Sequence, residues 1–157
     1  PCFDRYESTG SCFTGDSLAI VRNLAGGEDP CMISQLREGD FVRTTQDETD
    51  GYRRITRVWS SLITHRIGIC SFSANCHVTT LHPVCVDGAW YRPEMVRKCF
   101  WRRKEKLYNF ELEGHVDTML VGGFVCATLG LYCGPEFGWN VFTRKTTHCD
   151  MKHCAKC

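Results

Sequence analysis

Cys12 and His82, far apart in the sequence, could together break a peptide bond. Cys12 opens the segment Cys12–Asp16 (CFTGD), and its thiol directly follows the carbonyl of Ser11 along the chain. A thiol held beside that carbonyl has the entropic advantage of an intramolecular attack, which would form a thioester and free the amino group of Cys12. Because a thioester is less stable than an amide, the fold must strain the peptide bond or protonate the leaving nitrogen.

His82 lies in the segment Val78–Val84 (VTTLHPV) and is the natural proton donor for that nitrogen. Its imidazole titrates near neutral pH, so it can hold a proton and release it. The hydroxyl of Thr79, three residues earlier, could hydrogen-bond the scissile amide or orient the ring. Taken singly, Cys12 could be a buried structural cysteine and His82 a buried histidine before a proline turn. The interpretation therefore depends on their combination.

The elements that must position these residues are expected to be β-strands, since β-branched and aromatic runs alternate with Gly, Asp and Pro. The expected strands are 17–21, 31–33, 41–44, 52–62, 63–72, 76–80, 83–86, 89–91, 107–112, 116–121 and 124–127. We expect turns at 25–30, 36–40 and 87–88, a loop at 45–51 and one short helical turn at 93–97. Many short strands at close spacing predict an all-β barrel or sandwich.

Four segments, in this order and spacing, resemble the Hint superfamily, which includes inteins, Hedgehog C-terminal domains and bacterial intein-like domains. They begin at Cys12 (CFTGDS), Ile33 (ISQLREGDFV), Val78 (VTTLHPV) and Leu107 (LYNFELEGH). The chain is most similar to the Vint type, the Hint domains found beside von Willebrand factor A modules. The resemblance runs from Cys12 to about Gly130. It implies a flat, horseshoe-like, pseudo-twofold β-fold with both chain ends near one site.

The resemblance implies that Cys12 cleaves the Ser11–Cys12 bond by an N-to-S acyl shift, in a single turnover and like an autoprotease. Thr79 and His82 match the Thr-x-x-His box of the family, in which these residues have the two roles given above. Thr80 competes for the threonine role, but the spacing of the box selects Thr79. No cofactor is required for this chemistry.

The residues that inteins use to break the C-terminal bond are only partly present in this sequence. His115 resembles the late histidine of inteins, which assists in breaking the C-terminal bond, although it could equally be a solvated turn residue. Asp117 would share a strand face with His115 and could orient it. Inteins end in His-Asn followed by Ser, Thr or Cys, and the Asn cyclises. The matching stretch, Cys126–Thr128 (CAT), has no carboxamide, so we do not expect full splicing.

Without splicing, the thioester would be resolved by water or by an external thiol or amine. The expected partner is therefore a covalently attached upstream domain, and the von Willebrand factor A type is a candidate for it. The reaction would release this domain or transfer it to the nucleophile. We find no match for the extra aspartate of Hedgehog-type domains, so cholesterol transfer is not predicted. Two alternatives remain open: a Hint fold that has lost its activity, and a cysteine-rich module that binds through metal or disulfides.

The expected organisation is an upstream, linker-like flank (1–11), the Hint domain (12–130) and a Cys/His-rich extension (131–157). The chain has 12 cysteines, which we interpret as reduced thiols in preference to a disulfide framework. Cysteines inside apolar strand-like runs behave as small hydrophobic residues. These are Cys70, Cys85 and Cys126.

The extension holds a candidate zinc site with Cys154-x-x-Cys157 spacing. Cys149 or His153 could complete the set, together with Cys133 or His148. Disulfides or a frayed, cysteine-rich terminus are the alternatives to a metal.

Composition excludes some partner classes. The net charge of +1 argues against a general polyanion binder, and no run of residues is apolar enough to span a bilayer. A basic run with aromatic neighbours, Arg97–Lys106, could contact nucleic acid but is interpreted as a solvated loop. We therefore expect no membrane and no nucleic-acid partner. No signal peptide opens the sequence, which with reduced thiols predicts an intracellular, cytoplasmic location; secretion remains open.

Overall fold

The computed structural model describes residues 11–45, 51–116 and 118–129. Within them β-strands dominate, and helix is limited to α2 (Pro93–Val96) and two 3-10 turns, η2 (Ile33–Gln35) and η3 (Glu113–His115). The all-β prediction is confirmed. The strands are β1 (Phe13–Thr14), β2 (Leu18–Arg22), β3 (Glu28–Met32), β4 (Phe41–Arg43), β5 (Tyr52–Ser73), β6 (Cys76–Thr79), β7 (Val84–Val86), β8 (Ala89–Tyr91), β9 (Cys99–Leu112), β10 (Thr118–Val121) and β11 (Phe124–Ala127).

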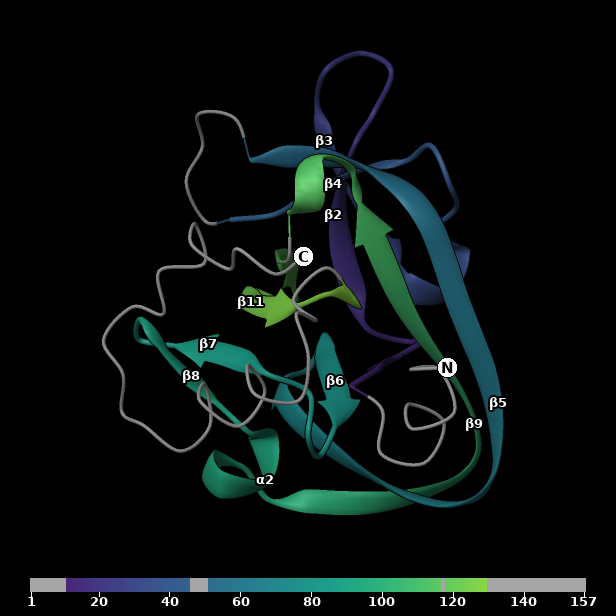
Figure 1. Ribbon diagram of the computed structural model, residues 1–157, viewed down its shortest axis with the longest axis vertical. Helices are drawn as coiled ribbons and strands as arrows, with labels where there is room; N and C mark the ends of the chain where they lie inside the picture. The colour runs from purple at the N-terminus through teal and green to yellow at the C-terminus, as the bar shows by residue number, and fades with distance from the viewer. Residues whose placement is uncertain (1–10, 46–50, 117, 130–157) are drawn as a thin grey trace.

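All strand pairings described are antiparallel, and they follow the order β6-β1-β9-β5-β4-β2-β10-β11-β7-β8. In addition, β3 pairs with β2, and β5 pairs with β6. Figure 1 shows β6 near the middle of the molecule, between β11 and the long curved strands β5 and β9. β6 pairs with β1, and the sulfur of its Cys76 lies 4.0 Å from that of Cys126 on β11. The short strand β1 is thus held between β6 and β9, because Phe13 pairs with Val78 on one side and Tyr108 on the other.

The longest element is β5, which pairs with β9 from Ile55↔Leu112 to Cys70↔Cys99. The two strands run together along one side and the base of the molecule (Figure 1). The sequence interpretation was wrong at two points here. The expected strands 52–62 and 63–72 are one continuous strand, and the basic run Arg97–Lys106, expected as a loop, lies mainly in β9. Polar residues interrupt both segments because this part of the ribbon is largely exposed.

Two short elements follow the predicted local chemistry. Asp87 and Gly88 both have positive φ, 50° and 78°, and join β7 to β8 as a two-residue turn, since Val86 pairs with Ala89. Positive φ at both central positions is typical of tight hairpins and favours Asp-Gly. Pro93 opens α2 at the first helical position, where its missing N–H costs nothing. The turn expected at 25–30 is shorter in the structure, because β3 already begins at Glu28.

The core draws residues from both halves of the chain. Phe13 and Phe110 are fully buried and their ring centroids lie 6.2 Å apart. Burial of an aromatic side chain supplies a large part of the hydrophobic stabilisation of a small domain. The strand that follows Cys12 is therefore fixed by packing as well as by its hydrogen bonds.

The cysteines do not share one state. Cys70 and Cys99, a directly opposed pair on β5 and β9, form a disulfide, so the interpretation of Cys70 as a reduced thiol is wrong. The remaining cysteines in the described part are free: Cys12, Cys31, Cys76, Cys85 and Cys126. In the described residues no helix is long and apolar enough to cross a membrane.

Candidate active site

The peptide nitrogen of Cys12 is held by the strand that carries Thr79. The N–H of Cys12 donates to Thr79 Oγ1 at 3.0 Å, and the N–H of Thr79 donates to the Cys12 carbonyl at 2.9 Å. Thr79 is the last residue of β6, which lies beside β1, and its side chain is buried. The carbonyl of Thr80 instead accepts from the N–H of Glu94 in α2. The structure thus places Thr79 against the amide that the sequence analysis singled out.

The carbonyl side of the same peptide bond is held by Asn109 on β9. Asn109 Nδ2 donates to the Ser11 carbonyl oxygen at 2.6 Å. The carboxamide is itself oriented, because its Oδ1 accepts the N–H of Phe110 at 2.8 Å. Both Ser11 and Asn109 are buried, so this hydrogen bond forms away from water. Each polar atom of the Ser11–Cys12 peptide unit therefore has a partner from a different strand.

His82 lies in the turn after β6 and is fully buried. Its Nε2 is 2.8 Å from the carbonyl oxygen of Ala127, at the end of β11. Because a carbonyl only accepts, we assign the ring proton to Nε2, and in the neutral ring Nδ1 then carries the lone pair. Nδ1 is buried and has no hydrogen-bond partner among the described residues. The ring packs on Phe13, the residue after Cys12, with centroids 4.3 Å apart.

Burial sets the protonation states of both reacting groups. It lowers the pKa of His82 to about 4, and the backbone of Ala127, which is hydrogen-bonded to Nε2, together with the nearby backbone of Cys12 offsets only part of this shift. Burial also raises the pKa of the Cys12 thiol to about 12. At neutral pH the site therefore holds a neutral thiol and a neutral imidazole. A neutral imidazole can accept a proton before it donates one, whereas the sequence analysis took His82 as the initial donor.

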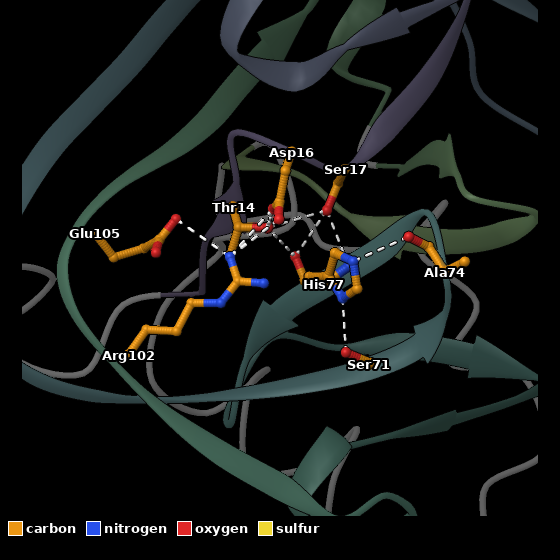
Figure 2. A network of polar contacts seen from close by, with 8 residues as sticks. All are labelled: Thr14, Asp16, Ser17, Ser71, Ala74, His77, Arg102 and Glu105. Atoms are coloured by element: carbon orange, nitrogen blue, oxygen red, sulfur yellow. Dashed lines mark hydrogen bonds and ion pairs between the residues drawn. The ribbon is translucent and has the colours of Figure 1, made fainter.

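A second polar cluster lies two residues beyond Cys12 and joins four strands (Figure 2). Asp16, from the CFTGD motif, hydrogen-bonds the Thr14 hydroxyl and forms an ion pair with Arg102 of β9 at 3.1 Å. His77 of β6 contacts Ser71 of β5 through Nδ1 at 2.6 Å, and its backbone contacts Ser17. These contacts tie the chain after Cys12 to β5, β6 and β9.

The C-terminal candidates are only partly described. His115 is the last residue of η3, whereas Asp117 and the proposed zinc ligands lie outside the described residues; those ligands are Cys133, His148, Cys149, His153, Cys154 and Cys157. Within the described ranges, no group of three His, Cys, Asp or Glu side chains could hold a metal ion. The stretch Cys126–Thr128 does reach the site, through the Ala127 carbonyl.

Sequence reasoning missed the contact between Asn109 and the Ser11 carbonyl. A buried carboxamide interrupts the apolar run Leu107–Leu112, in which Leu107, Tyr108, Phe110 and Leu112 are all buried. A polar side chain in such a run needs a hydrogen-bond partner to offset the cost of its burial. That requirement was the available signal, but the sequence did not show that the partner is the carbonyl before Cys12.

The comparisons with known proteins agree with this geometry. A family model described as Vint, Hint-domain matches residues 11–134. A search of curated proteins gives no match. Among solved structures, the DnaB intein from Synechocystis sp. PCC 6803 is 10% identical, with a TM-score of 0.56 over 76% of this chain and 99% of that one. The bacterial intein-like domain from Clostridium thermocellum is 15% identical, with a TM-score of 0.53 over 74% and 97%.

A variant of the gp41-1 intein is 14% identical, with a TM-score of 0.52 over 76% of this chain and 100% of its own. At these identities the likeness shows the fold alone, and it confirms the predicted Hint architecture. Since the family model covers most of the chain, from the residue before Cys12 to beyond β11, the chain belongs to the Vint family of Hint domains.

Proposed function

We propose that this domain processes itself: Cys12 attacks the Ser11 carbonyl, shifts the upstream chain from nitrogen to sulfur and so opens the Ser11–Cys12 bond. Membership of the Hint family supports a self-processing domain in general. One observation carries the specific proposal, namely that Asn109 and Thr79 hold the two sides of this one peptide bond. Buried backbone groups pair mostly with other backbone groups, whereas both partners of this peptide bond are side chains.

His82 is proposed to act first as base and then as acid. Its Nδ1 lone pair accepts the thiol proton as sulfur bonds to the Ser11 carbonyl carbon. The same proton then passes to the Cys12 nitrogen as the carbon–nitrogen bond breaks, so the imidazole ends as it began. The low pKa of His82 makes it a weak base but a strong acid once protonated, which favours delivery to the poorly basic leaving nitrogen.

Asn109 stabilises the oxygen on which negative charge develops. Its Nδ2 already lies 2.6 Å from the Ser11 oxygen, and its orientation is fixed by the Phe110 N–H. A donor of this kind, when buried and oriented before the reaction, typically accelerates acyl transfer about 10²–10³-fold. Thr79 Oγ1 holds the Cys12 N–H and so keeps the leaving nitrogen in place while the carbonyl carbon becomes tetrahedral.

The thioester is then resolved by water or by an external thiol or amine, and the upstream partner is released or transferred. Cys12 as a residue is half-buried, but its thiol is buried enough to raise its pKa, so the nucleophile must enter a largely enclosed site to reach the sulfur. Domains of this family are attached to a host protein, and the von Willebrand factor A type remains our candidate for it. His115 and Asp117 are proposed to assist later steps. No step proposed here uses a metal, and zinc in the 131–157 extension remains a separate proposal.

The test is release of an upstream tag from the purified chain. We expect first-order release that hydroxylamine or an added thiol accelerates, because each intercepts a thioester. Cys12→Ala should abolish it and His82→Ala should slow it strongly, while Cys31→Ala, a free cysteine on β3, serves as the matched control and should release normally. Equal release with and without Cys12 would remove the proposal. A folded chain that keeps its tag for days would instead indicate a Hint domain that has lost its activity.

A further inference from the structure

Positive charge in this chain is concentrated on the β5–β9 ribbon. The two strands together carry eight Arg and Lys residues against two Glu residues, a net charge of +6. Because the whole chain has a net charge of +1, all other residues together carry −5. The small net charge, from which no polyanion partner was expected, therefore hides a strong separation of charge. A cluster of one sign attracts a partner through its local potential.

The basic residues are densest on Leu62–Arg66 of β5 and Phe100–Lys106 of β9, which together form the basic rim. Its only acidic residue, Glu105, is half-buried and pairs with Arg102 at 3.5 Å. Five of its basic side chains are exposed: His65, Arg66, Arg103, Lys104 and Lys106. In Figure 1, β5 and β9 form the outer boundary of the molecule along one side and the base. The rim therefore faces outward, where a large partner can reach it.

The register of the ribbon sets two arginines of the rim directly opposite each other. Arg66 pairs with Arg103, and Gly68 pairs with Trp101, so these positions share one face. Directly opposed like charges destabilise a sheet, and among the described residues neither arginine has an ion-pair partner. Arg66 lies instead over the Trp101 ring, 5.1 Å from its centroid. An anionic partner would relieve the repulsion between the two guanidinium groups.

Exposed apolar side chains on the same rim indicate which anionic partner fits. Leu62 is 62% exposed and Trp101 is 61% exposed. A bilayer interface buries such side chains and is enriched in Trp, whereas contacts with nucleic acid go mostly to phosphate and sugar. A register shift between Ile63 and Arg66 and a positive φ of 53° at Lys104 mark a local bend of the ribbon. An outward-facing, bent rim suits a broad, flat surface.

We infer that the basic rim docks this domain on an anionic lipid bilayer. Arg66, Arg103 and Lys104 contact the charged head groups, and Leu62 and Trp101 enter the interface between them. The expectation of no membrane partner rested on the lack of an apolar run long enough to span a bilayer, and a surface contact needs no such run. The inference does not depend on the proposed function, because Cys12 is not part of the rim.

The test is co-sedimentation of the full chain with vesicles of phosphatidylcholine and phosphatidylserine, with pure phosphatidylcholine vesicles as the comparison. We expect the chain to bind the mixed vesicles at low salt, to be released as salt rises, and to leave the neutral vesicles unbound. Arg66→Gln with Arg103→Gln should weaken partitioning about 10–30-fold, since each charge near an anionic surface contributes about fivefold. The variant should stay folded, because the opposed like charges are gone; circular dichroism checks this.

Two further variants separate the rim from net charge and from pure electrostatics. The matched control, Arg22→Gln with Arg37→Gln, removes the same charge from exposed positions outside the rim. It should bind within about threefold of the parent, because binding follows the local potential. Trp101→Ser should weaken binding at every salt concentration, because burial of an apolar side chain is not screened by ions.

The outcomes that contradict the inference are distinct. If the variant without the arginine pair binds within about threefold of the parent, or if the control loses as much, the rim is not the contact. If Trp101→Ser binds like the parent, the apolar side chains do not enter the interface. A parent that ignores the mixed vesicles but retards a duplex oligonucleotide on a gel would show that the partner is a nucleic acid. None of these results alters tag release, which tests the proposed function separately.

Discussion

The peptide bond before Cys12 lies against Thr79 and Asn109, the stretch Cys126–Thr128 lies against His82, and the polar groups of the two are satisfied in different ways. The first has a donor on its oxygen and an acceptor on its N–H. The second offers the ring one carbonyl, from Ala127, while the buried hydroxyl of Thr128 has no partner among the described residues. The bond proposed for cleavage, before β1, is thus held on both sides by side chains, whereas the stretch at the end of β11 has no carboxamide that could cyclise.

Removing the donor on the Ser11 oxygen should have the largest effect. Asn109→Ala is expected to lower the rate of tag release about 10²–10³-fold, since the developing oxyanion would lose a fixed donor. Asn109→Asp is the near-isosteric control and should be at least as slow, because a carboxylate only accepts hydrogen bonds. Release within threefold of the parent for either variant would show that the contact is structural.

A distant change in the β5–β9 ribbon should affect stability and leave the site intact. Cys70→Ser with Cys99→Ser removes a crosslink over 29 residues, which by loop entropy is expected to lower the free energy of unfolding by about 3–4 kcal/mol. Urea unfolding with and without reductant measures this. Well below the unfolding midpoint, tag release should be unchanged. Slower tag release in the folded variant would show that the β5–β9 ribbon influences the reaction.

Burial of His82 makes the fold sensitive to acid. Its pKa is about 4 in the folded chain and about 6.5 when exposed, so the unfolded state binds more protons between these values. The free energy of unfolding is therefore highest above about pH 6.5. It decreases by about 3 kcal/mol as the pH falls toward 4. Urea unfolding at pH 7 and pH 4.5 measures it. In His82→Gln this component should disappear; an unchanged slope would argue that His82 is solvated.

The smallest effect is expected in the stretch Cys126–Thr128. Thr128→Val replaces a buried, unpaired hydroxyl with a methyl group of similar shape, so stability should stay the same or rise by about 1 kcal/mol. Tag release should be unchanged if the C-terminal stretch contributes only the Ala127 carbonyl. A marked loss of release would instead give the Thr128 hydroxyl a part in the reaction. Thermal unfolding and the release assay together decide this.

Residues that lie in recognisable local motifs could be predicted from the sequence. Residues whose contacts arise only when distant strands pair could not. Cys12, Thr79 and His82 lie in short segments with the expected types and spacing, and the structure brings them together; their roles stay predictions. Asn109 was missed because its partner is 98 positions away along the chain. The Cys70–Cys99 bond was missed because spacing alone does not reveal which cysteines face each other across two strands.

The strand boundaries teach the same lesson. Short strands that directly follow a Gly or Pro, such as β7, β8 and β11, lie within about one residue of their predicted positions. The continuity of β5 was missed because an exposed ribbon does not need an apolar face, so alternation fades over Ser60–Arg66.

For the proposed reaction, the contact between His82 and Ala127 has a consequence during synthesis of the chain. The carbonyl that fixes the ring proton belongs to β11, which is translated last among the described strands. A nascent chain that has not yet reached this strand has no acceptor for Nε2–H, and its Cys12 should stay inert while the upstream partner folds. A chain ending at Val121 should accordingly keep its tag. Adding the missing strand back as a peptide should then start release of the tag.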